Sequence, residues 1–217
     1  MEAAYEFDLV VIGSGPAGQS AAIQAAKLGK RVALIERKRG VGGVTVHLGT
    51  LPSKTFREAV ISLKRGTVQR SLEAAGIDHV NLTMEMLLAR VSSVIHDEQQ
   101  LIRSTLLRNG IKIFWGFASF VDEHTISIDS ADGDRTLTTA FTLLACGTRP
   151  VLPPGCPDQA ADESPIVLTS DTVGRLKEIP HSLVVVGGGV IGVEYASFFA
   201  VLGTKVTLVE RAARPIS

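Results

Sequence analysis

The chain has 217 residues, of which 45% are hydrophobic and 20% are charged, so it is long enough for one or two ordinary globular domains. Lys plus Arg and Asp plus Glu both total 22, and this balance argues against nucleic acid or an anionic membrane as a partner. The N-terminus has no basic signal-peptide region, and no apolar stretch reaches the roughly 18 residues of a membrane span, so we expect a cytoplasmic protein.

The first predicted elements form a strand–turn–helix–strand unit. An apolar strand over Leu9 to Ile12 enters a turn with the spacing G-x-G-x-x-G, and a helix-length segment follows. The helix is expected to stop at Leu28-Gly29, and a second apolar strand then ends in Glu36.

The three glycines of the turn have separate physical roles in binding a dinucleotide. Gly13 allows the tight turn, Gly15 lets the backbone approach a pyrophosphate, and Gly18 lets the helix pack closely on the strand. The pyrophosphate would lie on free N–H groups at the helix N-terminus, where the helix dipole favours negative charge. A carboxylate at Glu36 would accept hydrogen bonds from ribose hydroxyls.

A loop after Glu36 contains Gly42 and Gly43, which permit a close backbone approach, and Pro52-Ser53 then opens a helix. Lys54 is expected in the first turn of that helix, where a positive charge opposes the dipole. The spacing alone leaves two alternatives for Lys54: a solvated side chain, or a side chain compensated by a ligand or an acid.

The middle of the chain is expected to hold a helix followed by short strands. Apolar residues recur at helical spacing from Leu87 to Leu106, and Asn109-Gly110 ends the run. Short strands are predicted over 111–115, 118–121 and 125–128, with a hairpin turn at Asp132-Gly133. A buried-type strand follows over Phe141 to Ala145, and Pro153 to Pro165 is interpreted as a linker.

The segment from Ser182 to Arg211 repeats the segment from Asp8 to Arg37 at a constant offset of 174 residues, with 14 of 30 positions identical. Its turn has glycines at the same spacing, and Glu210 takes the place of Glu36. Two copies with a strand, a turn, a helix and an acid in the same places indicate duplication of a dinucleotide-binding unit. The glycines of the second turn are Gly187, Gly189 and Gly192.

Other chemistry-bearing patterns are absent from the sequence. The five histidines are scattered, so no metal site is predicted, and no G-x-S-x-G nucleophile motif occurs. Cys146 and Cys156 lack a C-x-x-C spacing and are expected to be reduced thiols.

The order of these motifs resembles the FAD-dependent pyridine nucleotide-disulfide oxidoreductases, a family that includes dihydrolipoamide dehydrogenase-like proteins. The resemblance rests on the first fingerprint, GGVTVHLGTLPSK, LLACGTRP and the second fingerprint, and it covers essentially the whole chain. It implies an α/β fold with two Rossmann-like units, built from parallel sheets with helices and a small antiparallel insertion, the second unit being truncated. The implied domains are an FAD-binding domain over 1–152, a linker over 153–180 and a first βαβ unit of an NAD(P)-binding domain over 181–217.

The resemblance also implies the site residues. Lys54 and Glu194 would be a catalytic pair beside the flavin. The implied NAD(P) contacts are Gly187, Gly189, Ile191, Gly192 and Glu210. The implied FAD contacts are Gly13, Ser14, Gly15, Pro16, Ala17, Gly18, Glu36, Arg37, Gly42, Gly43, Val44, Thr45, Lys54, Ala118, Ala145 and Gly147.

Thr45 and Thr50 stand where the disulfide reductases of the family carry two cysteines, so a dithiol relay cannot form here. The sequences of this loop and of Phe120 to Asp129 resemble those of the soluble transhydrogenases within the family. It implies hydride transfer between NADPH and NAD through FAD, with nicotinamide dinucleotides as substrates and a homodimer for full-length members.

Two alternatives stay open. Glu210 suits the free 2′-hydroxyl of NADH, which points to an NADH-dependent flavin oxidase or diaphorase, although Arg211 and Arg214 follow and could accommodate a phosphate. The second unit also ends after one strand–helix–strand at Ser217, so the chain as printed could be a non-catalytic nucleotide-binding fragment.

Overall fold

The computed structural model describes residues 4–64, 83–152 and 167–216. The chain forms two compact units: residues 1–47 with 95–149, and residues 48–94 with 150–217. Residues 153–166 of the predicted linker lie outside the described residues. The predicted domain boundaries stay a prediction, because compactness does not show which cofactor a segment binds.

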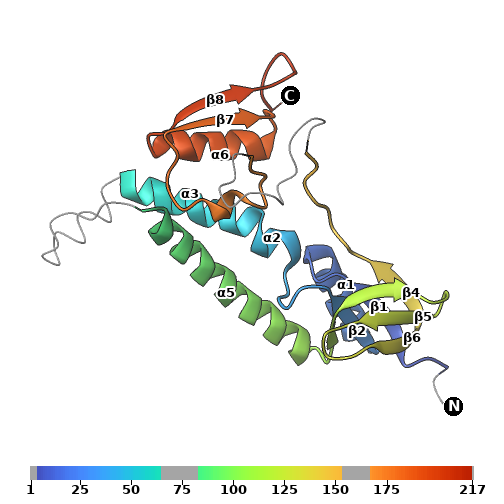
Figure 1. The fold of residues 1–217 in the computed structure, drawn as a ribbon. Coiled ribbons are helices and arrows are strands. Elements are labelled where there is room, and N and C mark those ends of the chain that lie inside the picture. Colours follow the sequence, from blue (N-terminus) through green and yellow to red (C-terminus); the bar gives the residue numbers. More distant parts are fainter. Residues whose placement is uncertain (1–3, 65–82, 153–166, 217) are drawn as a thin grey trace, which may run out of the picture. The chain divides into compact units, whose positions relative to one another are not determined.

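The first unit is built on a mixed six-stranded sheet with the strand order β3-β2-β1-β6-β5-β4. The strands β3, β2, β1 and β6 are parallel, whereas β4 and β5 form an antiparallel extension on β6 (Figure 1). This confirms the predicted parallel sheet with a small antiparallel insertion. The strands are β1 (Phe7–Ile12), β2 (Val32–Glu36), β3 (Lys112–Trp115), β4 (Phe117–Phe120), β5 (Thr125–Asp129) and β6 (Arg135–Leu144).

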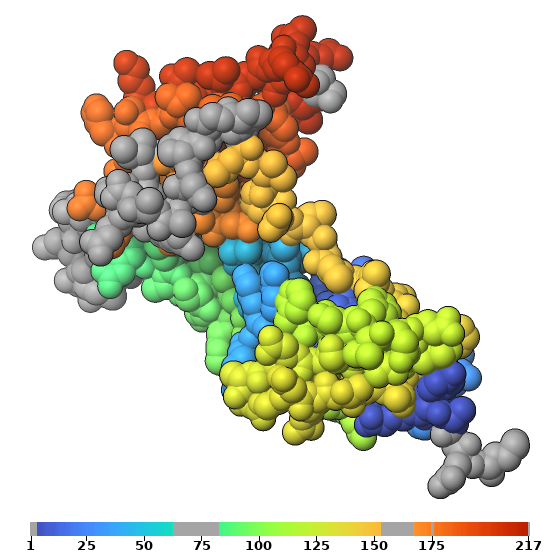
Figure 2. Space-filling view, turned by 45° about the vertical axis from the view of Figure 1, so that its right-hand side comes forward, coloured from blue at the N-terminus to red at the C-terminus, as the bar shows by residue number. Residues whose placement is uncertain are grey.

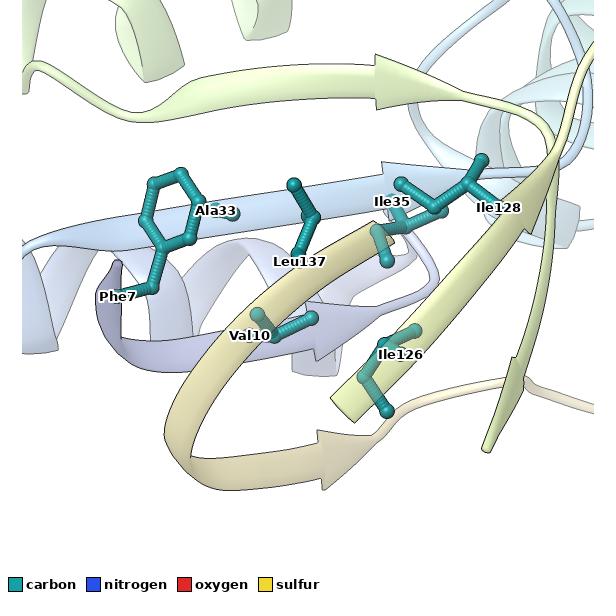
Figure 3. Close-up of a cluster of buried hydrophobic side chains, with 7 residues drawn as sticks. All are labelled: Phe7, Val10, Ala33, Ile35, Ile126, Ile128 and Leu137. Atoms are coloured by element: carbon teal, nitrogen blue, oxygen red, sulfur yellow. The ribbon is translucent and has the colours of Figure 1, made fainter. Parts of the chain in front are cut away.

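The two faces of the parallel part are covered differently. Helix α1 (Pro16–Lys27) lies on the face to which Val11 points, since a Cβ at Gly18 would lie 3.3 Å from Val11 Cγ1. The opposite face carries a hydrophobic core that joins the parallel strands to β5 and β6 (Figure 3). Side chains alternate between the faces of a strand, so the neighbours Val10 and Val11 enter different layers. The core cluster is Phe7, Val10, Ala33, Ile35, Ile126, Ile128 and Leu137.

Strand β6 differs from the prediction in length and in burial. It is one strand over ten residues, which pairs with β5 in its first half and with β1 in its second half. The segments β4, β5 and β6 form a continuous surface in yellow-green and yellow (Figure 2). The prediction of a buried strand over Phe141 to Ala145 is wrong, because Phe141 is 73% exposed, Leu144 is 63% exposed and the other three residues are half-buried. Within the described residues, α1 packs on β1 and β2, whereas Phe141 lies on β6, the next strand of the sheet.

Among the described residues, three helices lie between β2 and β3. Helix α2 (Gly43–His47) forms where a loop was predicted, and α3 (Thr50–Lys64) begins two residues before Pro52. Lys54 therefore lies in the second turn of α3 instead of the first. Helix α5 (Met84–Arg108) is confirmed, and it ends before Gly110, whose φ of 72° stops the helix.

The second unit contains the repeated strand–helix–strand. Strands β7 (Ser182–Val186) and β8 (Lys205–Val209) are parallel, and α6 (Val190–Val201) connects them and packs on one of their faces (Figure 1). Helix α3 packs on α6, where Phe56 contacts the rings of Phe198 and Phe199. A short 3₁₀ turn, Val173–Arg175, precedes β7. Among the described residues, no helix is both long and apolar enough to cross a bilayer.

Candidate functional site

The glycine turn, the acid Glu36 and the segment from Ala145 to Gly147 all begin where β1, β2 and β6 end, at the carboxyl end of the parallel strands. Ile12, Ile35 and Leu144 are partners across the three parallel strands, so Gly13, Glu36 and Ala145 follow at the same level. The backbone N–H of Gly13 donates to Ile35 O, and that of Ala145 donates to Ile12 O, each at 2.8 Å. Strands β2 and β6 lie on opposite sides of β1, so the order of strands changes direction at β1. Ligands of open α/β sheets bind at the carboxyl end of the strands at such a point.

Among the glycines at the first turn, only Gly15 has room for a side chain. A Cβ at Gly13 or at Gly18 would collide with a backbone carbonyl, and a Cβ at Gly43 would lie 2.7 Å from the Cα of Gly15. Gly13 also has a φ of 106°, which L side chains rarely adopt. By contrast, a Cβ at Gly15 would meet nothing within 4 Å, so open space lies in front of this residue.

The open space at Gly15 faces the start of a helix whose N–H groups lack a side-chain cap. Gly15 is the N-cap of α1, Pro16 occupies the first turn, and no acidic residue is present in that turn. The first N–H groups of a helix have no intrahelical partner and attract anions. A bare helix N-terminus beside an unfilled space fits the pyrophosphate of a dinucleotide.

Ser14 connects the glycine turn to the acid and to the loop that follows β2. Its side chain is fully buried, and its Oγ donates to Glu36 Oε2 at 2.6 Å while accepting from the Gly42 N–H at 3.0 Å. The Ser14 N–H also donates to Glu36 Oε2, and the Lys38 N–H donates to Oε1. Glu36 is thus oriented before any ligand arrives, with acceptor capacity left on Oε1 for a ribose hydroxyl.

The other residues expected at this site are distributed around the same end of the sheet. Pro16, Ala17 and Arg37 are exposed, Val44 and Thr45 lie on α2, and Gly147 follows β6. Ala118 lies on β4 and packs against the hydrophobic core. These placements describe the residues and leave their binding roles as predictions.

Sequence reasoning missed Gly116 at this end of the sheet. Its N–H donates to the carbonyl of Glu36 at 3.0 Å, and a Cβ there would lie 2.5 Å from Asp129 O. The glycine between two predicted strands, Ile111–Trp115 and Ala118–Val121, was the available signal.

The second copy reproduces these hydrogen bonds at the same offset of 174 residues. Gly187 N–H donates to Val209 O as Gly13 does to Ile35 O, and Gly188 N–H donates to Glu210 Oε2 as Ser14 does to Glu36. A Cβ at Gly192 would collide with Gly187 O, and a Cβ at Gly189 would meet nothing within 4 Å. The repeat seen in the sequence is therefore a repeat of geometry.

Glu210 follows β8 directly and has both carboxylate oxygens occupied by backbone donors. The N–H of Ala212 donates to Oε1 at 2.7 Å, and that of Gly188 donates to Oε2 at 2.5 Å. These bonds, Ala212 first, lower the pKa of Glu210 below its usual value. The second copy thus presents a fixed, ionised carboxylate beside its glycine turn. Ile191, the remaining residue expected there, is exposed on the first turn of α6.

The two residues expected to be catalytic form an ion pair in the second unit. Lys54 Nζ on α3 contacts Glu194 Oε1 on α6, and the side chain of Glu194 is 16% exposed against 56% for Lys54. The aromatic contacts of Phe56 with Phe198 and Phe199 hold the same two helices together. The alternative of a merely solvated Lys54 is therefore wrong, because an acid compensates its charge.

Tyr195 follows Glu194 and contacts Phe198 edge-on at 5.7 Å between ring centroids. Burial, and then the negative charges of Glu194 and Asp171, raise the pKa of Tyr195 to about 12. The hydroxyl therefore stays protonated at neutral pH. Within the described part of the chain, no group of three or more His, Cys, Asp or Glu residues could hold a metal ion.

Comparison with known proteins gives a consistent set of matches. The family model described as pyridine nucleotide-disulphide oxidoreductase matches residues 7–217. The soluble pyridine nucleotide transhydrogenase of Mycobacterium tuberculosis (strain ATCC 25177 / H37Ra) is 50% identical over 209 residues, which cover 95% of this chain and 44% of that protein. The soluble pyridine nucleotide transhydrogenase of Chromohalobacter salexigens is 40% identical over 219 residues, covering 99% of this chain and 46% of that protein.

A solved structure agrees with these relatives in fold. The HOCl-induced flavoprotein disulfide reductase RclA from Escherichia coli matches with a TM-score of 0.78 and 30% identity, over 95% of this chain and 42% of that chain. The chain thus spans less than half the length of the proteins that it matches.

Proposed function

The chain belongs to the pyridine nucleotide-disulphide oxidoreductase family, and from this premise we propose that its full-length protein transfers hydride between NADPH and NAD through bound FAD. The relatives at 50% and 40% identity carry the name soluble pyridine nucleotide transhydrogenase, which supports this reaction class. The observation that carries the proposal is the second glycine turn with its carboxylate, because an enzyme that uses two dinucleotides needs two such sites.

FAD would occupy the first copy and a nicotinamide dinucleotide the second. At the first copy, Glu36 would accept from the adenosine ribose, and the N–H groups of Ala17 and Gly18 would face the pyrophosphate. At the second copy, Glu210 and the start of α6 at Gly189 would do the same for the nicotinamide dinucleotide. Bound FAD supplies the hydride-accepting chemistry, and the protein supplies binding, orientation and charge.

Lys54 would be held in position by Glu194 and would present a positive charge to the reduced cofactor. The ion pair and the packing of Phe56 against α6 restrict the lysine side chain, which otherwise has many rotamers. Neutralising Glu194 would leave Lys54 charged but less well oriented.

Reduction without a redox-active disulfide is part of the proposal. Thr45 lies on α2 and Thr50 begins α3, and a hydroxyl cannot take part in thiol–disulfide exchange. Hydride transfer by a Cys146→Ser variant, which removes the exposed thiol beside Gly147, should therefore survive treatment of the NADPH-reduced protein with iodoacetamide. A loss of activity under that treatment would show that a thiol takes part.

A second candidate function, an NADH-dependent flavin oxidase or diaphorase, is favoured by Glu210. Its ionised carboxylate accepts two backbone N–H bonds and would repel the 2′-phosphate of NADPH. Arg211 and Arg214 are exposed beside it and are the residues that would offset this repulsion in a transhydrogenase.

Location and assembly complete the proposal. We place the protein in the cytoplasm and expect a homodimer of full-length chains. A nucleotide-binding role without catalysis is the alternative for a protein limited to these residues.

An anaerobic assay separates these functions. The full-length protein, loaded with FAD, is mixed with NADPH and the thio analogue of NAD, whose reduced form absorbs at a distinct wavelength. The proposal predicts reduction of the analogue without oxygen. Turnover that requires oxygen and prefers NADH would support the oxidase instead, and flavin binding without either reaction would support the non-catalytic role.

A further inference from the structure

One histidine near the first copy has both ring nitrogens in hydrogen bonds. His47 is the last residue of α2, and its Nε2 lies 3.2 Å from Gly40 O and 3.1 Å from Val41 O. Its Nδ1 lies 3.2 Å from Nε2 of Gln99 on α5. All four residues belong to the first compact unit.

These contacts determine which ring nitrogen carries the proton. Both carbonyl oxygens are acceptors, so Nε2 must be the donor. Gln99 donates its amide N–H to Nδ1, which must then be the unprotonated acceptor. The tautomer with the proton on Nε2 satisfies every contact.

The carbonyls that His47 holds belong to the segment Gly40–Gly43, which rests on the glycine turn. Gly42 N–H donates to Ser14 O at 3.2 Å and to Ser14 Oγ at 3.0 Å. Gly43 lies so close to Gly15 that a Cβ would be 2.7 Å from its Cα. The position of this segment therefore sets the shape of the space beside Gly15.

The absence of a side chain at Gly40 leaves room for the ring of His47. A Cβ at Gly40 would lie 2.9 Å from His47 Cε1 and 3.5 Å from Gln99 Nε2. The ring can approach the carbonyls of the segment only because residue 40 has no side chain. Gly40, His47 and Gln99 thus form one packed contact.

We propose that His47 is a positioning residue for FAD, which acts by holding the Gly40–Gly43 segment against the glycine turn while Gln99 holds its ring. The inference rests on the proposed assignment of FAD to the first copy. His47 contacts the carbonyls of Gly40 and Val41, and Ser14 accepts from the N–H of Gly42, so the two residues hold the segment at consecutive positions. A segment fixed before binding costs less conformational entropy when the cofactor arrives.

The test compares FAD dissociation constants of apo-protein prepared from the full-length protein, measured by quenching of flavin fluorescence. His47→Leu removes both carbonyl contacts and should weaken FAD binding about tenfold. His47→Gln retains a donor near the place of Nε2 and should restore affinity to within about threefold of wild type. Gly40→Ala, which displaces the ring, should weaken binding without removing the histidine.

His124→Leu is the matched control. His124 also contacts a backbone carbonyl in the first unit, with Nδ1 2.9 Å from Thr139 O, but it lies beside β5 and β6 and stacks on Tyr5. His124→Leu and His47→Leu should both lower the thermal stability of the apo-protein, but His124→Leu should leave FAD affinity unchanged. If His47 has a positioning role, only His47→Leu weakens FAD binding. If both histidines merely stabilise the fold, both variants weaken it.

The outcomes are distinguishable. If wild type binds FAD and His47→Leu binds it equally well, the inference is overturned and the proposed function stands. Equal weakening by His124→Leu, or no rescue by His47→Gln, would also overturn the inference. If wild type binds no FAD, the proposed function fails and the inference fails with it.

Discussion

At the scale of single residues, the two copies differ most clearly next to their carboxylates. Ser14 stands beside Glu36, whereas Gly188 stands beside Glu210, so only the first carboxylate accepts from a neighbouring hydroxyl. A Cβ at Gly188 would lie 3.0 Å from Glu210 Cβ and Cγ, so a side chain there would require Glu210 to shift. The first carboxylate thus accepts two hydrogen bonds from its turn, whereas the second accepts one.

Replacing Ser14 by alanine should therefore affect the first copy alone. Ser14→Ala leaves the Gly42 N–H with only the carbonyl of Ser14 and removes a short bond to Glu36, at an expected cost of about 1–2 kcal/mol in the free energy of unfolding. FAD affinity should fall, whereas affinity for NADH should not change. Urea unfolding and separate titrations with the two nucleotides provide the measurements, and equal losses at both sites would contradict the assignment of the copies.

Glu210 should control the choice between NADH and NADPH. In Glu210→Gln the negative charge is lost, so the ratio of kcat/KM for NADPH to that for NADH should rise about tenfold. Glu36→Gln is the matched change in the first copy, and it should weaken FAD binding without changing this ratio. An unchanged ratio in Glu210→Gln would remove Glu210 from nucleotide selection.

The pKa of Glu210 adds a pH dependence to that prediction. Because backbone donors lower this pKa, the carboxylate stays ionised throughout the neutral range, and its effect on the ratio of kcat/KM for NADPH to that for NADH should be constant from about pH 9 to about pH 7, where the 2′-phosphate is also fully ionised. A preference that disappears across that range would mean that another group sets it.

At the scale of elements, the close contact between each helix and its glycine turn is the feature most sensitive to added volume. A Cβ at Gly18 or Gly192 would collide with the carbonyl of the first glycine of the same turn. A Cβ at Gly15 or Gly189 would meet no protein atom within 4 Å. The same substitution should therefore have different effects at the second and third glycines.

Gly18→Ala should destabilise the first unit by about 2–3 kcal/mol and abolish FAD binding. Gly15→Ala should fold with wild-type stability and still lose FAD affinity, because its methyl group enters the space meant for the pyrophosphate. Gly189→Ala is the control in the second copy and should retain FAD but lose NADH. Thermal unfolding and nucleotide titration check each variant, and normal FAD binding by Gly15→Ala would place the pyrophosphate elsewhere.

The starts of β1 and β2 are joined by an ion pair that predicts a pH-dependent stability. Arg31 donates side-chain and backbone hydrogen bonds to Asp8, and these lower the pKa of Asp8 from 3.8 to about 2. The stability from this pair is present above the unfolded pKa and is lost as pH falls from about 4 towards about 2. Asp8→Asn should thus have a lower urea midpoint than wild type at neutral pH, and the two midpoints should converge at about pH 2. A difference that is constant with pH would rule out this pair as its cause.

The repeated elements could be predicted from the sequence because each signal occurred twice. The strands, glycine turns and terminal acids follow from local pattern, and the structure confirms them. Helix α2 was missed, since a helix of five residues that begins at a glycine is too short to show helical periodicity. The approach of Lys54 to Glu194 depends on the packing of α3 on α6 across 140 residues, which local pattern cannot show and which only the family resemblance suggested.

At the scale of the whole molecule, the duplication is the central feature. One compact unit carries a turn and an acid that fit FAD, and the other carries a turn and an acid that fit a nicotinamide dinucleotide. Residues 48–94 group with the C-terminal unit, in which Phe56 and Lys54 have their partners on α6. Both members of the proposed catalytic pair thus belong to the unit that holds the second copy.

The initial-rate pattern of anaerobic transhydrogenation tests the central claim most directly. In the full-length protein loaded with FAD, the NADPH concentration is varied at several fixed concentrations of the thio analogue of NAD. A single nicotinamide site that exchanges hydride with FAD predicts parallel lines in double-reciprocal plots, because one product leaves before the other substrate binds. Intersecting lines would contradict the account, since they require both nicotinamide dinucleotides to be bound together.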